Sequence, residues 1–213
     1  MTAHKPFLVG IINMCLLLSL FGCAQKTPRQ ALEGEQIPVK TIVLLPVEIV
    51  AADEGGESAA NERAQLVAGQ NALNAILAEY FAGNEAVTIL SEGQRDALDK
   101  GVTRCRTTAA VNICRFYKAD AVLLTTVQRY VEREGTEYSI ISPASVSFDY
   151  KLVLAETGQT LCAGTFSETQ KPLLEDMFQF FKKAKRGFKW LTAEALARDG
   201  VQQKLSGCPY LQK

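Results

Sequence analysis

The residue types that most often carry catalysis are scarce in this chain. Its only histidine is His4, close to the N-terminus. A chain that loses this residue with a leader has no Ser–His or Cys–His pair, no histidine-ligated zinc site and no C-x-x-C-H haem attachment. The sequence also contains no G-x-x-x-x-G-K-[ST], G-x-G-x-x-G, G-x-S-x-G or S-x-x-K motif. We therefore expect no cofactor, no metal site and no enzymatic activity.

Carboxylates are the remaining candidates for chemistry. Asp53, Glu54 and Glu57 occupy a glycine-rich loop after the first expected strand, a position at which α/β sheets often hold ligands. Two of them at a suitable separation could serve glycan hydrolysis, and the group could also bind calcium. A solvated loop explains these residues equally well. A second group of charges fits a solvated hairpin tip: Glu132, Arg133, Glu134 and Glu137.

Cys23 stands at the end of a leader-like N-terminus. The chain is largely apolar from Phe7 to Phe21, which is short of the roughly 20 residues of a spanning helix and matches a signal-peptide core. The stretch LFGC resembles the lipobox of bacterial lipoproteins, with Leu20 at −3, Gly22 at −1 and Cys23 as the lipid acceptor. Phe21 departs from that pattern, in which a small residue is usual at −2.

Three alternatives are open for this stretch. In the preferred one, residues 1–22 are a signal peptide and Cys23 becomes the lipidated first residue. A peptidase could instead cut after Ala24, because Gly22-Cys23-Ala24 is also a small-x-small site, or the segment could stay uncut as an anchor. The lipobox resemblance, with Ala24 where an aspartate is associated with inner-membrane retention, implies the outer membrane. Several acyl chains, palmitate among them, would hold the protein there on the periplasmic side.

Four cysteines belong to the body of the chain: Cys105, Cys114, Cys162 and Cys208. In an oxidising compartment they allow up to two disulfides with three connectivities. On one continuous helix Cys105 and Cys114 would lie about 13 Å apart, so they can pair only if the helix begins after Cys105. The alternative is that some remain buried free thiols, which behave as small apolar groups.

The composition is that of a globular protein. The 213 residues are 47% hydrophobic and 22% charged, with 23 basic and 23 acidic residues. Removing residues 1–22 leaves a charge of about −1, so nucleic-acid binding is not expected. Residues 23–38 contain two prolines and indicate a lipidated anchor with a flexible tether, whose mean reach is about 20 Å. Residues 39–208 suit a single globular α/β domain.

Apolar periodicity and turn residues predict five strands or strand pairs and five helices. The strands are expected at 39–47, 87–90, 121–131, 138–154 with a break at Pro143, and 159–170. The helices are expected at 62–81, 92–100, 108–118, 173–185 and 192–205, the second opened by a Ser91-x-x-Gln94 capping box. The order β-α-β-α-α-β-β-β-α-α favours a mixed α/β sheet with an antiparallel three-strand meander and helices packed on it.

Residues 176–190, DMFQFFKKAKRGFKW, combine aromatic and basic side chains on a predicted helix. An amphipathic helix on lipid or on a partner protein explains this pattern. The preferred explanation is a helix that packs its aromatic face on the sheet and carries basic residues near its C-terminus. Trp190, Phe188 and Arg186 are the candidate partner contacts.

The stretches KADAVLLTTV (118–127) and ETGQTLCAGTF (156–166) resemble a known group of exported domains. These are the TolB amino-terminal, curli-secretion and penicillin-binding-protein-activator lipoproteins, and the resemblance covers about residues 39–170. Matching positions are Asp120, Gly158, Leu161 and Gly164. Lys118 replaces the usual glycine region, and Cys162 stands where tryptophan is common.

This resemblance implies a non-catalytic, lipid-anchored envelope protein that acts as an adaptor or as an assembly or activator factor. Its partners would be the membrane, through the N-terminal lipid, and an envelope protein; a homo-oligomer is compatible with this role. The alternatives are a carboxylate-dependent envelope glycan hydrolase and a subunit of a curli-type secretion pore. The pore is disfavoured because no additional amphipathic strand of about 9–11 residues lies between 39 and 62.

Overall fold

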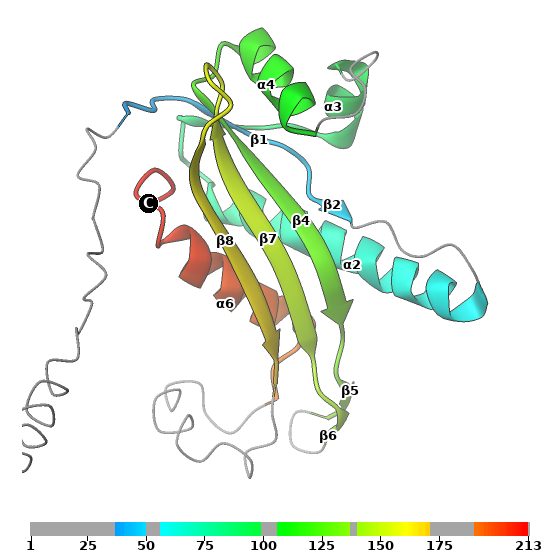
Figure 1. The fold of residues 1–213 in the computed structure, drawn as a ribbon. Helices are drawn as coiled ribbons and strands as arrows, with labels where there is room; N and C mark the ends of the chain where they lie inside the picture. The colour runs from blue at the N-terminus through cyan, green and yellow to red at the C-terminus, as the bar shows by residue number, and fades with distance from the viewer. Residues whose placement is uncertain (1–36, 50–55, 99–105, 137–139, 171–189, 213) are drawn as a thin grey trace, which may run out of the picture. The chain divides into compact units, whose positions relative to one another are not determined.

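The computed structural model describes residues 37–49, 56–98, 106–136, 140–170 and 190–212 (Figure 1). Residues Pro38–Lys213 form a compact unit of their own, and every helix and strand named below belongs to it.

The unit is built on a mixed sheet with the strand order β3-β1-β4-β7-β8. On one side, β1 (Ile42–Leu44) runs parallel to β3 (Val87–Ile89) and to β4 (Ala121–Val131). On the other, β7 (Ser145–Leu154) pairs antiparallel with β4, and β8 (Thr160–Thr169) pairs antiparallel with β7. The predicted mixed sheet with a three-strand meander is confirmed.

The strand predicted at 39–47 is shorter than expected and is followed by a separate piece, β2 (Glu48–Ile49), which also pairs parallel with β4. Pro46 explains the interruption, since proline has no N–H for the ladder. The helix α2 (Gly56–Tyr80) holds the backbone there instead. Val47 N–H donates to Asn74 Oδ1 at 2.8 Å, and Gln70 Nε2 donates to Val47 C=O at 2.6 Å.

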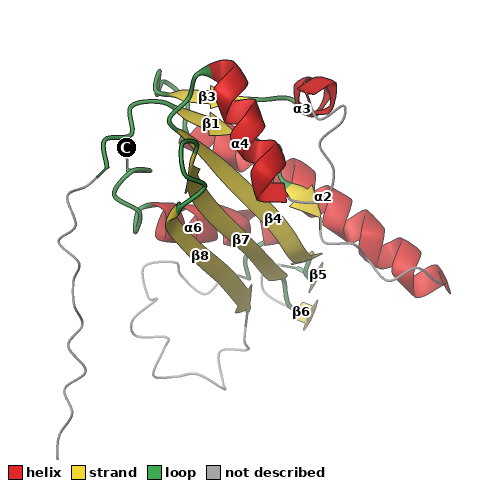
Figure 2. Cartoon of the chain, turned by 45° about the horizontal axis from the view of Figure 1, so that its top comes forward, coloured by secondary structure: helices red, strands yellow, loops and turns green. Residues whose placement is uncertain are grey.

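Helices cover both faces of the sheet (Figures 1 and 2). On one face α2 packs beside α6 (Ala193–Leu205), and on the other α4 (Arg106–Tyr117) packs over the β1 end. The short α3 (Glu92–Leu98) begins with the predicted capping box, in which Ser91 N–H donates to Gln94 Oε1 at 2.9 Å. The helix predicted at 173–185 lies outside the described residues.

Each helical layer has its own apolar core. The core beneath α2 and α6 contains the side chains that alternate along β7, with large members from the helices: Val146, Phe148, Tyr150, Leu152, Leu73, Leu77 and Leu196. The core beneath α4 is smaller: Val43, Val122, Val153, Ile113 and Cys114. The period-two pattern of β7 thus separates an apolar face from a polar one.

β5 (Glu134–Gly135) and β6 (Ile140–Ser142) form a separate two-stranded ribbon beyond the meander. The predicted strand at 138–141 therefore falls partly in this ribbon rather than in the main sheet. Pro143 separates β6 from β7 and accounts for the break, because it cannot donate to a ladder.

Asp120 fastens the start of β1 to the start of β4. Its Oδ2 accepts the N–H of Lys40 at 2.8 Å, the N–H of Thr41 at 3.0 Å and the Thr41 hydroxyl at 3.2 Å. These bonds favour the charged carboxylate and hold the pKa of Asp120 below its ordinary value. Asp120, one of the positions that carry the resemblance to exported domains, therefore has a structural role in the described fold.

Candidate functional site

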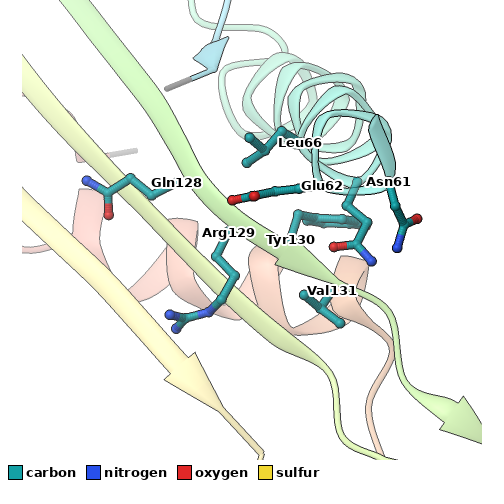
Figure 3. Close-up of a pocket in the computed structure, with 8 residues that line it drawn as sticks. Asn61, Glu62, Leu66, Gln128, Arg129, Tyr130 and Val131 are labelled. Carbon is teal, nitrogen blue, oxygen red and sulfur yellow. The ribbon is translucent and has the colours of Figure 1, made fainter. Parts of the chain in front are cut away.

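A groove of about 290 Å³ lies between the N-terminal half of α2 and the far end of β4 (Figure 3). The strand contributes Gln128–Val131 to its lining, and the helix contributes Asn61, Glu62, Gln65 and Leu66. Leu66 is buried, whereas Asn61 and Glu62 are exposed and Gln65 is half-buried. The groove therefore has a polar rim over an apolar floor.

Beside the groove, β4 continues beyond the last residues of β1 and β2 that the structure describes as paired with it. In the described part of the chain, pairing with β2 ends at Val127. Gln128 is an extra residue at this point, since Val127 is opposite Phe148 and Arg129 is opposite Ser147. Such a bulge twists a strand and often ends pairing or redirects a side chain.

Gly69 lets α2 approach the strand closely at this point. A Cβ added to Gly69 would lie 2.5 Å from the Cβ of Tyr130, a distance that real side chains do not tolerate. The ring of Tyr130 occupies the place that a side chain at Gly69 would need. The helix and the strand are therefore fixed relative to each other beside the groove by a contact that requires glycine.

The guanidinium of Arg129 does not point into the groove. Figure 3 shows its side chain leaving β4 on the side away from α2. There Nε donates to Ser145 Oγ at 2.6 Å and a terminal nitrogen donates to Ser167 Oγ at 3.0 Å. Arg129 thus cross-links β4, β7 and β8 on the polar face of the sheet.

The same polar face carries a second short chain of hydrogen bonds. Ser147 Oγ donates to Gln128 Oε1 at 2.9 Å, and Gln128 Nε2 donates to Asp149 Oδ2. The other carboxylate oxygen of Asp149 is buried and has no hydrogen-bond partner among the described residues. The side-chain amide of Gln128 is therefore hydrogen-bonded on the polar face of the sheet, while its backbone lies at the strand edge.

Tyr130 is half-buried and lies near two carboxylates. Burial, together with the carboxylates of Glu132 and Glu194, raises the pKa of Tyr130 to about 12. Glu132 accepts the N–H of Ala193 at 3.0 Å through one oxygen and at 3.2 Å through the other. It thereby caps the first turn of α6, alongside Thr192, whose hydroxyl accepts the Ala195 N–H at 3.2 Å. The interpretation of Glu132 as part of a solvated hairpin tip misses this contact.

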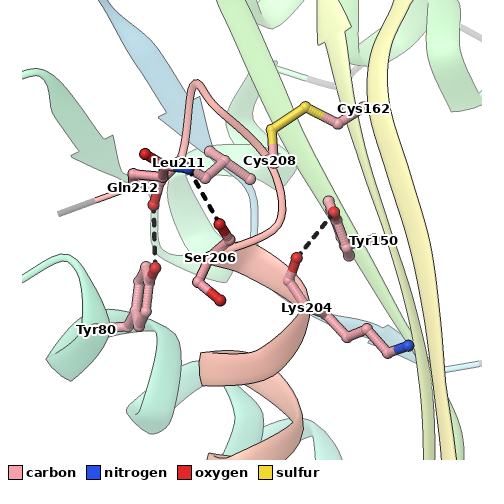
Figure 4. The surroundings of a disulfide bond; sticks show 8 residues. All are labelled: Tyr80, Tyr150, Cys162, Lys204, Ser206, Cys208, Leu211 and Gln212. Atoms are coloured by element: carbon pink, nitrogen blue, oxygen red, sulfur yellow. Dashed lines mark hydrogen bonds between the residues drawn. A yellow bond between two sulfur atoms is a disulfide. The ribbon is translucent and has the colours of Figure 1, made fainter. Parts of the chain in front are cut away.

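Two of the four body cysteines, Cys162 and Cys208, form a disulfide between β8 and the turn after α6 (Figure 4). Their Cα atoms are 6.0 Å apart, within the usual range. Cys114 is a free, buried thiol, and its burial in an apolar core raises its pKa to about 12, with Asp120 adding to the shift. It matches the alternative of a thiol that acts as a small apolar group. Cys105 lies outside the described residues.

The turn after α6 is held at further points shown in Figure 4. The hydroxyl of Tyr80 donates to Leu211 C=O at 3.1 Å, and the hydroxyl of Tyr150 donates to Lys204 C=O at 3.1 Å. Leu211 itself is buried in the larger core. The segment from Lys204 to Leu211 is therefore tied to α2, β7 and β8.

The other residues singled out in the sequence are not brought together by the described structure. Trp190 is half-buried, and the neighbouring Leu191 N–H donates to Gln170 Oε1 at 2.9 Å. Glu57 belongs to the first turn of α2. Outside the described residues lie Cys23, Asp53, Glu54, Arg186 and Phe188.

Among the described residues, no three histidine, cysteine, aspartate or glutamate side chains group closely enough to hold a metal ion. No helix within the same residues has the length and apolar content of a membrane span.

Comparison with known proteins assigns no family. No family model matches the chain, and no curated protein matches it. Among solved structures, a PelC dodecamer from Paraburkholderia phytofirmans is 13% identical, with a TM-score of 0.45, over 84% of this chain and 92% of that chain. The C-terminal domain of LpoB from Salmonella enterica is 16% identical, with a TM-score of 0.37, over 64% and 87% of the two chains.

Lipoprotein GNA1162 from Neisseria meningitidis is 17% identical to this chain, with a TM-score of 0.33. The match covers 70% of this chain and 97% of that one. These scores and identities carry no function to this chain, so a functional proposal has to come from its own residues.

Proposed function

We propose that this protein is a lipoprotein of the bacterial cell envelope, fastened by Cys23 to the periplasmic side of the outer membrane. Its domain acts there as a non-catalytic adaptor, or assembly or activator factor, that binds a protein partner. The observation that carries the binding role is the groove beside the far end of β4, whose helical wall presents side chains not engaged within the described fold.

The anchor is supported by the N-terminal sequence. An apolar run ends in Leu20-Phe21-Gly22-Cys23, and a polar stretch with two prolines follows before the first strand. Acyl chains on Cys23 would hold the protein at the membrane surface, because each buried CH₂ contributes about 0.8 kcal/mol and several chains add. The tether then allows the domain to reach a partner about 20 Å from the membrane.

The binding role is supported by the rim of the groove. The side chains of Asn61, Glu62 and Gln65 form no hydrogen bond or ion pair with other described residues, although they share one stretch of helix. By contrast, Gln70 and Asn74 of the same helix are engaged with the backbone of Val47. Polar side chains left available above an apolar floor are the arrangement that a protein interface uses.

The experiment is fractionation and crosslinking of intact cells that express the wild type, Cys23→Ser or the control Cys15→Ser, which changes the other cysteine of the N-terminal stretch. We expect the wild type and Cys15→Ser to sediment with the outer membrane and to form one discrete adduct with an envelope protein. Cys23→Ser should be released from the membrane and lose most of the adduct, since the tether no longer concentrates it at the surface. Persistence of Cys23→Ser in the membrane would contradict the anchor.

A second set of variants separates an adaptor from a glycan hydrolase. Asp53→Ala, Glu54→Ala and Glu57→Ala, combined in one chain, remove the carboxylates that could serve hydrolysis. We expect the triple variant to fold and to keep both the adduct and the cellular phenotype. A folded triple variant without function, together with glycan turnover by the wild type, would establish glycan hydrolysis and contradict the adaptor role.

A further inference from the structure

The far end of β4 is an unpaired strand edge within the described chain. β1 pairs with Ala121–Leu123 and β2 pairs with Thr126 and Val127, but no described strand pairs with Gln128–Val131 on that side. An edge of this kind presents backbone N–H and C=O groups at the spacing of a β-ladder. The polypeptide that satisfies them is therefore an extended one.

The helix α2 forms a wall beside this edge. In Figures 1 and 2 its first turns extend beyond β4, past the limit of the sheet. The groove is open to solvent, and its volume of about 290 Å³ is at the lower limit of small-molecule sites, which hold about 300–1,000 Å³. A few residues of extended chain, lying along the strand with one side chain in the groove, suit this space better than a compact ligand.

The charge of the groove determines which kind of side chain of a bound segment fits into it. Glu62 reaches from α2 toward β4 (Figure 3), and it forms no ion pair with the described residues. Arg129, the other charged residue of the lining, directs its guanidinium to Ser145 and Ser167 on the opposite side. Glu132 adds negative charge near Tyr130, whereas Glu194, the other carboxylate there, forms an ion pair with Arg198 at 3.2 Å. The groove therefore complements a basic side chain.

We propose that a protein partner adds an extended segment to the edge of β4 at Gln128–Val131 and places a lysine or arginine beside Glu62. The mode is strand addition, in which main-chain hydrogen bonds contribute affinity and a side-chain contact contributes specificity. This inference rests on the proposed adaptor function and specifies the partner segment and its site.

The test uses a displayed library of random peptides, selected on the full-length protein purified in detergent. Selected peptides should be rich in β-branched residues and contain at least one lysine or arginine. Glu62→Gln should weaken their binding about 2- to 5-fold, as expected for one exposed ion pair. Glu85→Gln, which removes a carboxylate from an exposed turn outside the groove, is the matched control and should leave the affinity unchanged.

Hydrogen exchange supplies the second readout. A bound peptide should slow exchange by about tenfold or more at alternate amides of Gln128–Val131, because every second N–H of a strand faces each edge. Amides of the outer edge strand β8, which provides the other long edge of the sheet, should be unaffected.

Four outcomes overturn the inference: no peptide enriched, binding insensitive to Glu62→Gln, protection at β8 instead of β4, or concentration-dependent protection of Gln128–Val131 without peptide. The last would identify a second copy of the chain as the occupant. Each of these leaves the acylation of Cys23 and the envelope adduct untouched, so failure of the strand-addition site is distinguishable from failure of the adaptor function.

Discussion

Asp120 joins two strands that are distant in the sequence. Its single oxygen Oδ2 accepts three hydrogen bonds from Lys40 and Thr41, which hold the start of β1 against the start of β4. The lowered pKa of this carboxylate means that the folded state stabilises its charged form more than the unfolded state does. The contribution to stability is present above the unfolded pKa of about 3.9 and is lost as the pH falls through the lower folded pKa.

Asp120→Asn should therefore lower the free energy of unfolding at neutral pH by about 1 kcal/mol, the value for hydrogen bonds to a charged group discounted for solvent screening. Below about pH 4 the difference from the wild type should shrink, because the carboxylate of the unfolded wild type then begins to bind a proton and the folded one follows at lower pH. Urea unfolding at several pH values measures both effects. Asp96→Asn, at an exposed position in α3, is the control, and an equal effect of both variants would contradict the assigned role.

The Cys162–Cys208 disulfide is expected to contribute to the thermal stability of the domain. Cys162 and Cys208 are 46 residues apart, and a bridge closing such a loop typically stabilises a domain by about 2–4 kcal/mol. A reductant should therefore lower the Tm of the wild type by about 4–16 °C. It should have no further effect on the double variant Cys162→Ala, Cys208→Ala. A wild-type Tm that reductant does not change would show that this bridge is absent or contributes nothing.

The sequence contains four body cysteines that could pair in an oxidising compartment, but it could not choose among three connectivities. The choice depends on α6 returning along β8, which brings Cys208 beside Cys162. Glu132 was similarly placed only at a charged tip. Glu132 caps the first turn of α6, which lies 61 residues further along the chain but contacts Glu132 in the fold. No local sequence pattern predicts such a long-range contact.

At the scale of elements, two helices depend on glycines that lie against aromatic rings. Gly69 of α2 meets Tyr130 of β4, and Gly200 of α6 meets Phe166 of β8; a Cβ at either position would lie 2.7 Å or less from its ring residue. These contacts set how closely each helix approaches the sheet. The contact at Gly69 also sets the wall of the groove.

Gly69→Ala should reduce the free energy of unfolding by about 1–3 kcal/mol, because overpacking forces the helix or Tyr130 to move. Gly93→Ala is the matched control, since a Cβ at this helical position in α3 meets nothing within 4 Å. It should stabilise the protein by up to about 1 kcal/mol through helix propensity. Denaturant unfolding of the two variants measures the difference. Equal effects would mean that α2 does not lie as closely on β4 as described.

Element types were accessible from the sequence wherever periodicity was strong. The strand at 121–131 and the alternation in β7 were placed correctly, since burial of one face imposes a period of two. Boundaries were less accessible. α2 begins at Gly56 rather than at 62, and the alanines at 59, 60 and 64 favour this extension.

The groove was not accessible from the sequence at all. It depends on the extra residue Gln128 and on the direction in which α2 crosses β4. A bulge has no reliable sequence pattern when it carries no glycine. Residues 61–66 appear in the sequence only as the polar start of an amphipathic helix.

At the scale of the whole molecule, we propose that the N-terminus holds the protein at the membrane and that the domain binds the partner. Under the proposed function, a lipid on Cys23 would confine the protein to the membrane surface, and the tether would raise the local concentration of the groove near envelope proteins. A weak strand-addition site is sufficient under these conditions, because confinement adds effective affinity without a new contact.

The most direct test of this account is mass spectrometry of the N-terminal peptide of the protein purified from its native envelope. The account predicts a mature chain that begins at Cys23 and carries the mass of several acyl chains, whereas Cys23→Ser yields no acylated peptide. An unmodified N-terminus at Gln25, as left by a cut after Ala24, or a chain that retains residues 1–22 would contradict it.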